Sequence, residues 1–490
     1  MKTALQTYEP VLGFEVHVEL NTVTKMFSTA TNAFGDQPNS NVTAGDLGMP
    51  GTLPTINRVG IDYGIKLGLA LNCTIAPESR FARKQYFYPD LGKNYQTSQL
   101  EPAIAYDGYV DVELDDGEIF RVEIERAHIE EDAGKLTHMG STGRIHDASA
   151  SLVDYNRAGV PLVEIVSRPI TGAGERAPEL ARAYLATIRD IVKALNVSDA
   201  RMERGNIRCD ANVSLMPIGS ATFGTRTETK NVNSTRAVAA AVESEIIRQA
   251  KALDAGESIT QETRHWDEES RSTRSGRPKS DADDYRYFSD PDLVPIVTDE
   301  AWIDRLRAEL PENPIQRRRR LREEWAFSES EFRDVVAAGV LDEIEATVVA
   351  GATAEAARKW WMGEIARIAN EKGVSPEALG VTAADVVEIE RLIADSTIND
   401  KIARQVVGHV AEGEGRPTEV VEARSLAVVS DDGALTAAVE EAMAANPDVV
   451  ERIKDGHMQA VGALIGPVMK ATKGQADAGR VREIILEKIG

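Results

Sequence analysis

The sequence is poor in cysteine and in long apolar runs. It has two cysteines among 490 residues, Cys73 and Cys209. Each has apolar residues two positions away on both sides, which is typical of reduced core thiols and argues against a disulfide framework or a zinc cluster built on them. No apolar run approaches the roughly 18 residues that a membrane span needs, and the N-terminal stretch lacks the apolar core of a signal peptide. We therefore expect a cytoplasmic protein without a membrane partner.

Basic residues are also fewer than acidic residues. The chain has 56 basic and 79 acidic residues, so its net charge is −23. This excludes attraction of nucleic acid over the whole surface, and any RNA contact must be local. Basic residues cluster in 316–322 (QRRRRLR) and again near the C-terminus. By itself, a run of like charge is more often a solvated helix face than an RNA contact.

What the chain does contain changes in character along its length. Residues 1–295 alternate strand-like segments with turns, and include helical patterns at 180–195 and after a predicted N-cap at Asn233 or Ser234. Strand signals nearly disappear after residue 295, and a Gly/Pro break follows at 412–417. We predict an α+β protein: a mixed α/β domain at 1–295, an all-α domain at 296–410 and an all-α tail domain at 411–490.

The segment VLGFEVHVEL (11–20) has strict two-residue alternation. Apolar side chains occupy one face of this predicted strand, and Glu15, His17 and Glu19 occupy the other. Two carboxylates and an imidazole on one face suit a hard cation or a metal-bound phosphate. The alternative is a solvated edge strand.

Further acidic residues lie in two other strand-like segments. In RVEIERAHIEEDAGK, His128 precedes three consecutive carboxylates, Glu130, Glu131 and Asp132, which repel one another unless a cation lies among them. An exposed turn would explain them equally well. Glu164 stands between apolar residues in VPLVEIVS, where an unpaired carboxylate would be costly. It needs a metal, a cation or a donor, and Arg157 or Arg168 would serve as a structural partner.

Two more strand-like segments, RGNIRCDANVSLMP and GTRTETKNVNS, carry polar faces of mixed sign. Such faces suit a nucleotide's phosphates together with a carboxylate substrate, or a hydrated barrel wall. The segments ARKQYFYPDLGKNYQTSQ and DDYRYFSDPD interleave aromatic and basic residues. These mixtures can stack bases or hold phosphates, although more often they anchor loops.

Nine ordered motifs, spread over the whole chain, resemble those of the GatB family, the B subunit of the bacterial aspartyl/glutamyl-tRNA(Asn/Gln) amidotransferase. They are GFEVHVEL, SNVTAGDLGMPGTLP, RKQYFYPDLGKNYQTSQ, AHIEEDAGK, LVDYNRAGVPLVEIVS, RCDANVS, KNVNS, QETRHWDE and DYRYF. The resemblance implies a catalytic cradle at 1–295, a helical domain at 296–410 and a tRNA-binding tail at 411–490.

The implied activity is a ligase reaction that corrects Glu-tRNA(Gln) or Asp-tRNA(Asn). An amidase-type glutaminase hydrolyses glutamine, the GatB protein uses ATP and Mg²⁺ to phosphorylate the misacylated side-chain carboxylate, and ammonia then attacks it. The implied partners in a heterotrimer are that glutaminase and one further small subunit. The chain itself has no recognisable amidase Ser/Lys signature, so ammonia must come from a partner. The rival interpretations are a noncatalytic tRNA-binding scaffold and a free-standing ligase for small carboxylates and amines.

The resemblance also implies site residues. The predicted catalytic residues are Glu15, His17, Glu131 and Glu164, of which His17, Glu131 and Glu164 are the predicted magnesium ligands. Those predicted around ATP are Glu130, Glu228, Lys230 and Asn231. Lys470, Lys473, Arg480 and Arg482 are predicted to contact tRNA phosphates.

The chain departs from the family pattern in two places. Many members hold zinc through paired cysteines, but the matching positions here include Ser28, Ala30, Thr43 and Asp46. These side chains do not form a zinc-ligand set, so we predict no zinc. Ser289 stands where a proline is usual, which leaves the conformation of the loop at 271–292 open.

Overall fold

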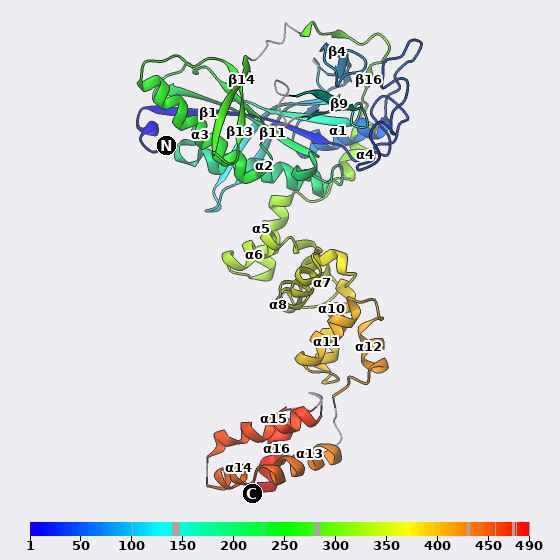
Figure 1. Ribbon diagram of the computed structural model, residues 1–490, viewed down its shortest axis with the longest axis vertical. Coiled ribbons are helices and arrows are strands. Elements are labelled where there is room, and N and C mark those ends of the chain that lie inside the picture. Colours follow the sequence, from blue (N-terminus) through cyan, green and yellow to red (C-terminus); the bar gives the residue numbers. More distant parts are fainter. Residues whose placement is uncertain are drawn as a thin grey trace. The chain divides into compact units, whose positions relative to one another are not determined.

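The computed structural model divides the chain into two compact units, Met1–Arg317 and Arg318–Gly490. It describes residues 1–99, 101–139, 148–230, 232–278, 285–428, 432–455, 457–472, 476 and 478–489. Strands β1 to β16 all lie in the first unit, and the elements described in the second unit are helices (Figure 1). The predicted α+β class is confirmed.

The first unit is built on a nine-stranded sheet. Only the β12–β13 pair is parallel among the pairings described in it. The strand order is β14 (Ser272–Pro278), β13 (Glu262–Asp267), β12 (Thr227–Lys230), β11 (Ile207–Pro217), β1 (Tyr8–Glu19), β10 (Pro161–Ser167), β7 (Ile119–Glu131), β6 (Ala105–Glu113) and β2 (Thr74–Ile75).

Three small sheets flank the large one. They pair β15 (Phe288–Ser289) with β4 (Ala82–Gln85) and β5 (Tyr95–Ser98), β16 (Ile296–Val297) with β3 (Glu78–Ser79), and β8 (Lys135–Met139) with β9 (Ala150–Asp154).

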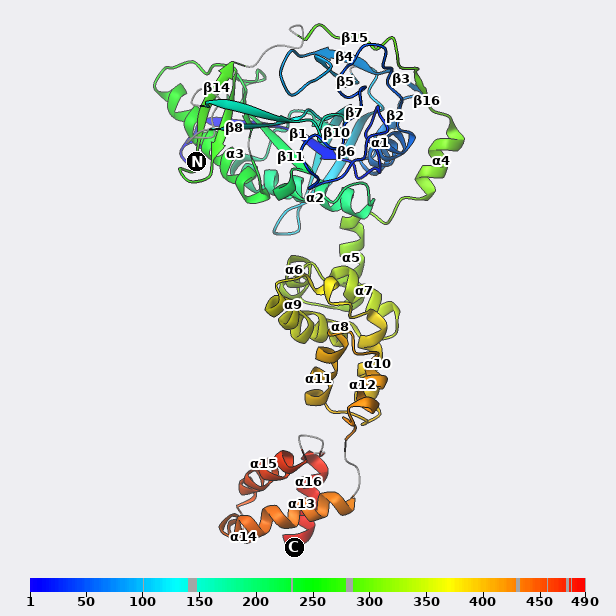
Figure 2. The same ribbon diagram turned by 45° about the vertical axis from the view of Figure 1, so that its right-hand side comes forward.

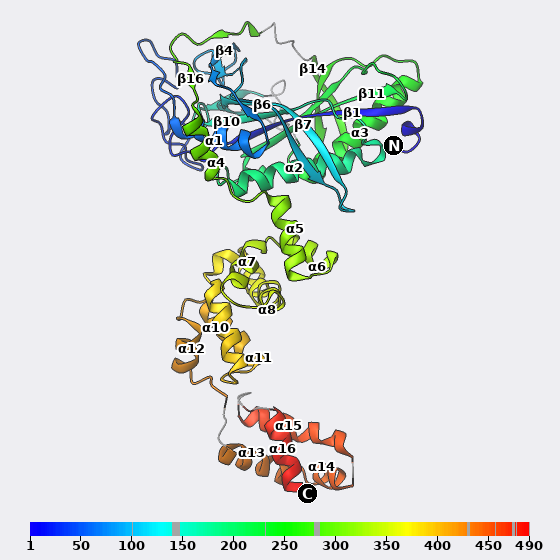
Figure 3. The same ribbon diagram turned by 180° about the vertical axis from the view of Figure 1, so that it is seen from behind.

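Helices cover one face of the large sheet. The predicted helices at 180–195 and after Ser234 are α2 (Ala177–Ala194) and α3 (Thr235–Asp254), which pack side by side beneath it (Figures 1 and 3). The Ser234 hydroxyl caps α3 by accepting a hydrogen bond of 3.0 Å from the Ala237 N–H. Phe14 of β1 stacks on Tyr184 of α2 with ring centroids 5.0 Å apart. The apolar side of β1 therefore faces the helices, and its polar side faces away from them.

Helix α1 (Arg58–Ala70) lies unusually close to strands β6 and β7. Its glycines at 60, 64 and 68 recur every four residues and so share one face. A Cβ on Gly64 would lie 2.6 Å from Ile129 of β7, and one on Gly68 would lie 2.5 Å from Ala105 of β6. The absence of side chains at these positions permits the close approach.

Helix α4 (Glu300–Ala308) belongs to the first unit although it follows the predicted boundary at 295. The Trp302 indole N–H donates a 2.8 Å hydrogen bond to Asp62 of α1, and Arg58 stacks 3.9 Å from the Trp302 ring centroid. Leu306 is fully buried in the core of that unit. Helix α5 (Pro314–Trp325) contains the boundary between the two units.

The second unit has two separate apolar cores. The helices that contribute to them are labelled in Figure 2. The first core contains buried residues from Leu321 to Val421 and the second those from Leu435 to Ile485. The helices after α5 are α6 (Glu329–Ala338), α7 (Leu341–Val349), α8 (Ala354–Lys359), a π-helical turn (Trp360–Ile365), α9 (Ala366–Lys372), α10 (Ala383–Ala394), α11 (Asp400–Val410), α12 (Pro417–Ala423), α13 (Asp432–Ala445), α14 (Pro447–Lys454), α15 (Val461–Ala471) and α16 (Ala478–Ile489).

Within the described parts of the chain, every helix is too short or too polar to span a bilayer.

Candidate active site

Strand pairing aligns polar residues across the face of the sheet that points away from α2 and α3. His17 of β1 lies directly opposite Glu164 of β10 and Arg208 of β11. Glu164 in turn lies opposite His128 of β7. Residues directly opposite one another in neighbouring strands point to the same face of a sheet. Four polar side chains from four strands thus form one row.

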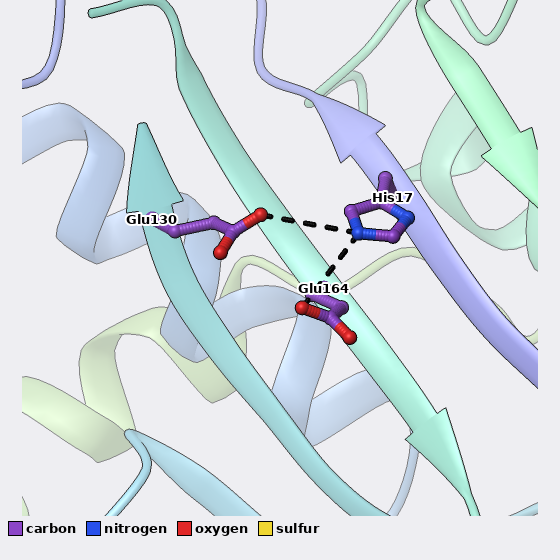
Figure 4. Close-up of side chains that lie close together, drawn as sticks. All are labelled: His17, Glu130 and Glu164. Atoms are coloured by element: carbon purple, nitrogen blue, oxygen red, sulfur yellow. Dashed lines mark ion pairs between the residues drawn. The ribbon is translucent and has the colours of Figure 1, made fainter. Parts of the chain in front are cut away.

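His17, Glu130 and Glu164 form a compact group, which we call the His17 cluster (Figure 4). His17 Nε2 lies 3.6 Å from Glu164 Oε2 and 3.9 Å from Glu130 Oε1. One ligand atom from each residue lies within 4.8 Å of the others. An imidazole and two carboxylates at this separation fit a divalent cation that accepts oxygen and nitrogen ligands.

His128 of the neighbouring strand β7 lies close to both carboxylates of this cluster. Its Nε2 lies 3.2 Å from Glu164 Oε2 and 3.8 Å from Glu130 Oε2. Burial alone would lower the pKa of His128, but the negative charges of Glu164 and Glu130 outweigh it and raise the pKa to about 9. Burial likewise opposes ionisation of Glu164, whereas His128 and His17 hold its pKa well below the usual range. These imidazoles stabilise the ionised Glu164 carboxylate, which burial alone would disfavour.

A second acidic group comprises Glu15, Asp210 and Glu228 of β1, β11 and β12, and we call it the Glu15 cluster. Its ligand atoms also lie within 4.8 Å of one another. The Lys230 ammonium lies 2.6 Å from Asp210 and 3.5 Å from Glu228. Burial lowers the pKa of Lys230, but the charges of Asp210 and Glu228 outweigh it, and the pKa is raised above its ordinary value. The Asn212 amide donates to Glu15 at 3.0 Å.

A cavity of about 560 Å³ is lined by all three residues of the His17 cluster and by Asp210 of the Glu15 cluster. Its lining includes three cations beside the carboxylates: Lys84, Arg208 and Lys230. Arg208 also lies 3.2 Å from Asp132. A second cavity, of about 750 Å³, is lined by Glu15 together with Asn212, Ser214 and Arg226 among others. Negative and positive groups are thus interleaved around a space large enough for phosphate-bearing ligands.

The structure brings most of the predicted site residues together, but in a different grouping. His17 and Glu164 share a cluster with Glu130, not with Glu131. The Glu131 carboxylate instead accepts hydrogen bonds from the Lys93 ammonium and, at 2.8 Å, from the Thr97 N–H. Glu15 and Glu228 lie in the other cluster. The predicted role of Glu131 as a magnesium ligand and catalytic residue stays a prediction, and the site geometry does not favour it.

Glu130 joins His17 and Glu164 in place of the predicted Glu131 because strand β7 contains an irregularity. Val122 and Ile124 face the core, as do Ala127 and Ile129, so the inward-facing parity changes between residues 124 and 127. The pairing shifts at the same point, because Val166 pairs with Arg126 while Ser167 pairs with Ile124. A β-bulge of this kind redirects every later side chain. It brings His128 and Glu130 to the site.

Sequence reasoning did not name His128, Asp210, Arg208 or Lys84 as site residues, although it singled out the segments that contain them. The polar faces carrying Asp210 and Arg208 were visible as alternation, but their juxtaposition with Glu15 and His17 depends on strand register. Lys84 comes from the separate three-stranded sheet, and no local pattern indicates where it lies.

The predicted tRNA contacts lie in the second unit. Lys470 and Arg482 are exposed, and Arg480 lies 2.9 Å from Glu483. Asn231 and Lys473 lie outside the described residues. In the first basic cluster, Arg320 lies 2.8 Å from Glu345 and 3.0 Å from Glu324, as expected for a solvated helix face.

The segments that match the family's zinc region are held by other interactions. Asp46 is buried and accepts hydrogen bonds from the Thr43 N–H at 2.7 Å and the Thr43 hydroxyl at 2.9 Å. The buried Lys25 ammonium lies 3.7 Å from Asp46 and donates to the Tyr155 carbonyl at 3.1 Å. These donors do not fit zinc.

Comparisons with known proteins identify the family of this chain. Residues 10–304 match the family model for the GatB/GatE catalytic domain, and residues 342–489 match that for the GatB domain. Similar curated proteins are named as the B subunit of aspartyl/glutamyl-tRNA(Asn/Gln) amidotransferase. Those of Paenarthrobacter aurescens (strain TC1) and Pseudarthrobacter chlorophenolicus are each 65% identical, and that of Streptomyces avermitilis is 58% identical. Each alignment covers 99% of this chain and 97% of the relative.

The domain content is therefore that of an amidotransferase component with a GatB/GatE-type catalytic domain. The chain belongs to the GatB family, and the resemblance noted in its motifs is confirmed.

Proposed function

We propose that this chain activates the side-chain carboxylate of Glu-tRNA(Gln), Asp-tRNA(Asn) or both by ATP-dependent phosphorylation, and then directs ammonia to it. The observation that carries the proposal is one cavity lined by the whole His17 cluster, by Asp210 of the Glu15 cluster and by three cations, Lys84, Arg208 and Lys230. The relatives' names refer to the same class of substrate.

The chemistry explains why both signs of charge are needed. A carboxylate is a poor acyl donor, and an amide forms readily only after one carboxylate oxygen has become part of a phosphate leaving group. Phosphoryl transfer is accelerated mainly by positioning and by stabilisation of charge on the transferring group. Bound Mg²⁺ would neutralise phosphate charge and polarise phosphoryl oxygens. His17, Glu130 and Glu164 would hold one such ion, and Glu15, Asp210 and Glu228 another.

The chain's own cations complete the proposed site. Lys84, Arg208 and Lys230 would bind oxygens of the phosphate and of the substrate carboxylate. Arg208 lies directly opposite His17, so it can contact an anion held at the His17 cluster. The 750 Å³ cavity beside Glu15 is large enough for a nucleoside. ATP would then place its phosphates at the Glu15 cluster.

The proposed partners follow from the reaction. Ammonia would come from an amidase-type glutaminase, a further small subunit would complete a heterotrimer, and misacylated tRNA would be the substrate. The relatives are named as one subunit of their own enzymes, which supports an assembly of this kind. A tRNA substrate also favours a cytoplasmic location.

Substrate-dependent ATP cleavage tests this proposal. The purified complex is incubated with ATP and Glu-tRNA(Gln) without any amide donor, and release of ADP is followed. Cleavage that requires the charged tRNA is expected. No cleavage would favour the noncatalytic scaffold, and equal stimulation by free glutamate would favour a small-molecule ligase.

A further inference from the structure

Four tyrosines lie close together, and we call them the tyrosine group: Tyr86, Tyr88, Tyr285 and Tyr287. Two of them, Tyr86 and Tyr285, line the cavity. The four residues come from two segments far apart in sequence. Strands β4 and β15 pair antiparallel, with Phe288 opposite Arg83 and Ser289 opposite Ala82. Tyr86 follows β4 directly, and Tyr285 and Tyr287 come just before β15. The pairing of the small sheet thus brings the aromatic segments together.

The rings contact one another in sequence. Tyr86 stacks on Tyr88 with centroids 5.6 Å apart and lies 6.4 Å from Tyr285, which lies 6.2 Å from Tyr287. The Lys84 ammonium lies 4.7 Å from the Tyr285 ring centroid. Aromatic rings beside a cation can bind a nucleobase by stacking while the cation attracts its phosphate.

The tyrosine group is continuous with the candidate active site. Tyr86, Tyr285 and Lys84 line the same cavity as His17, Glu130 and Glu164.

The four tyrosine rings are more exposed than aromatic residues that only anchor a loop in the core. All four tyrosines are half-buried. Aromatic residues in the core of the first unit, such as Phe14 and Tyr184, are instead fully buried. Aromatic residues make up only 5% of the chain, so four in one group beside the catalytic face is a marked local concentration.

We propose that the tyrosine group binds the 3′-terminal adenosine of the charged tRNA by stacking the base against Tyr86 and Tyr285. This inference rests on the function proposed above. In an aminoacyl-tRNA the amino acid is esterified to the ribose of that adenosine, so the base lies one sugar away from the reacting residue. The adenine of ATP is separated from the transferring phosphate by the ribose and two further phosphates. A stacking surface beside the His17 cluster therefore suits the RNA end better than ATP.

The test uses a small probe so that contacts of the rest of the tRNA do not mask the effect. The probe is 3′-(glutamylamino)-3′-deoxyadenosine, whose amide resists hydrolysis, and its counterpart lacks the base. Each is measured as a competitive inhibitor of the assembled complex. Stacking on one aromatic ring typically contributes about 5- to 150-fold in affinity. The inhibition constant of the adenosine probe should rise by that factor in Tyr86→Leu and Tyr285→Leu, whereas that of the base-free probe should not change.

Matched variants separate stacking from misfolding. Tyr86→Phe and Tyr285→Phe keep the ring and should keep the affinity for the probe. Phe87→Leu alters a neighbour that is 87% exposed, and it should leave all constants unchanged. Equal inhibition of wild type and both Leu variants would overturn the proposal. A rise in KM for ATP with unchanged probe inhibition would also overturn it and assign the rings to ATP. If the wild-type complex cleaved no ATP with charged tRNA, the proposed function itself would fail.

Discussion

At the scale of single residues, the site depends on which carboxylates point toward His17. The alternation that begins with Val122 and Ile124, if continued, would place Glu131 on the solvent-facing side with Glu123. The bulge near Glu125 reverses this, and Glu130 joins the cluster. Sequence patterns could identify the polar face of β1 because it alternates without interruption. They could not locate a bulge that depends on the pairing of β7 with its neighbours.

A magnesium titration distinguishes the two glutamates. In Glu130→Gln and His17→Ala, we expect the tRNA-dependent ATP cleavage rate to fall about 100- to 1,000-fold, because charge stabilisation at the phosphate is lost. The magnesium concentration for half-maximal rate should rise, while the affinity for tRNA stays within a few-fold of the wild-type value. Glu131→Gln should not shift the magnesium midpoint, since its carboxylate pairs with Lys93. A larger midpoint shift in Glu131→Gln than in Glu130→Gln would contradict this grouping.

The zinc region supports a second prediction at the residue scale. Asp46 is held by Lys25 and Thr43, and neither of the two cysteines lies in these segments. Elemental analysis of purified protein should therefore show no stoichiometric zinc, and a zinc-selective chelator, with Mg²⁺ in excess, should leave the melting temperature of the first unit unchanged. One tightly bound zinc per chain would refute this prediction.

At the scale of elements, helices were easier to predict than strand partners. The helical patterns at 180–195 and after Ser234 are set by residues three and four apart, so they are visible locally, and both are found as α2 and α3. The His17 row joins four strands whose order in the sheet differs from their order in the sequence. Such an arrangement depends on strand pairing across the whole sheet, and a short stretch of sequence carries no information about that pairing.

Helix α1 offers a direct test of close packing. Gly→Ala within a helix usually stabilises a protein by about 0.5–1 kcal/mol. At Gly68 the added methyl would meet Ala105 at 2.5 Å, so overpacking should reverse the sign and destabilise the first unit by about 1–3 kcal/mol. The control is Gly408→Ala in α11, where nothing lies within 4 Å of the new Cβ. Denaturant unfolding of each variant, followed for both units, would show this contrast. Stabilisation by Gly68→Ala would rule out the close approach.

At the scale of the whole molecule, a chain of net charge −23 must bind a polyanion through local contacts. The predicted tail at 411–490 includes Val420 and Val421, which are buried in the first core of the second unit. A truncation at about Glu412 would damage that core, whereas one after Val428 removes the core that contains Leu435 to Ile485 and leaves the other complete.

Truncation after Val428 tests the tail's contribution. If Lys470, Arg480 and Arg482 contact phosphates, the truncated complex should show a strongly raised KM for charged tRNA and a flatter dependence of log affinity on log salt. Glutamine hydrolysis by the partner glutaminase should stay measurable and serves as the control for assembly. The alternative is that these cations only balance nearby acids, as Arg480 does with Glu483. An unchanged salt slope and an unchanged KM would establish that alternative.

The most direct test of the proposed activity follows one oxygen atom. The complex is supplied with ATP, glutamine and Glu-tRNA(Gln) whose side-chain carboxylate carries ¹⁸O in both positions. Activation by phosphorylation transfers one of those oxygens to phosphate, so mass spectrometry should find one ¹⁸O in inorganic phosphate for each amide formed. In His17→Ala, labelled phosphate and amide should fall together. Amide formation accompanied by unlabelled phosphate would contradict the proposed activation of the carboxylate.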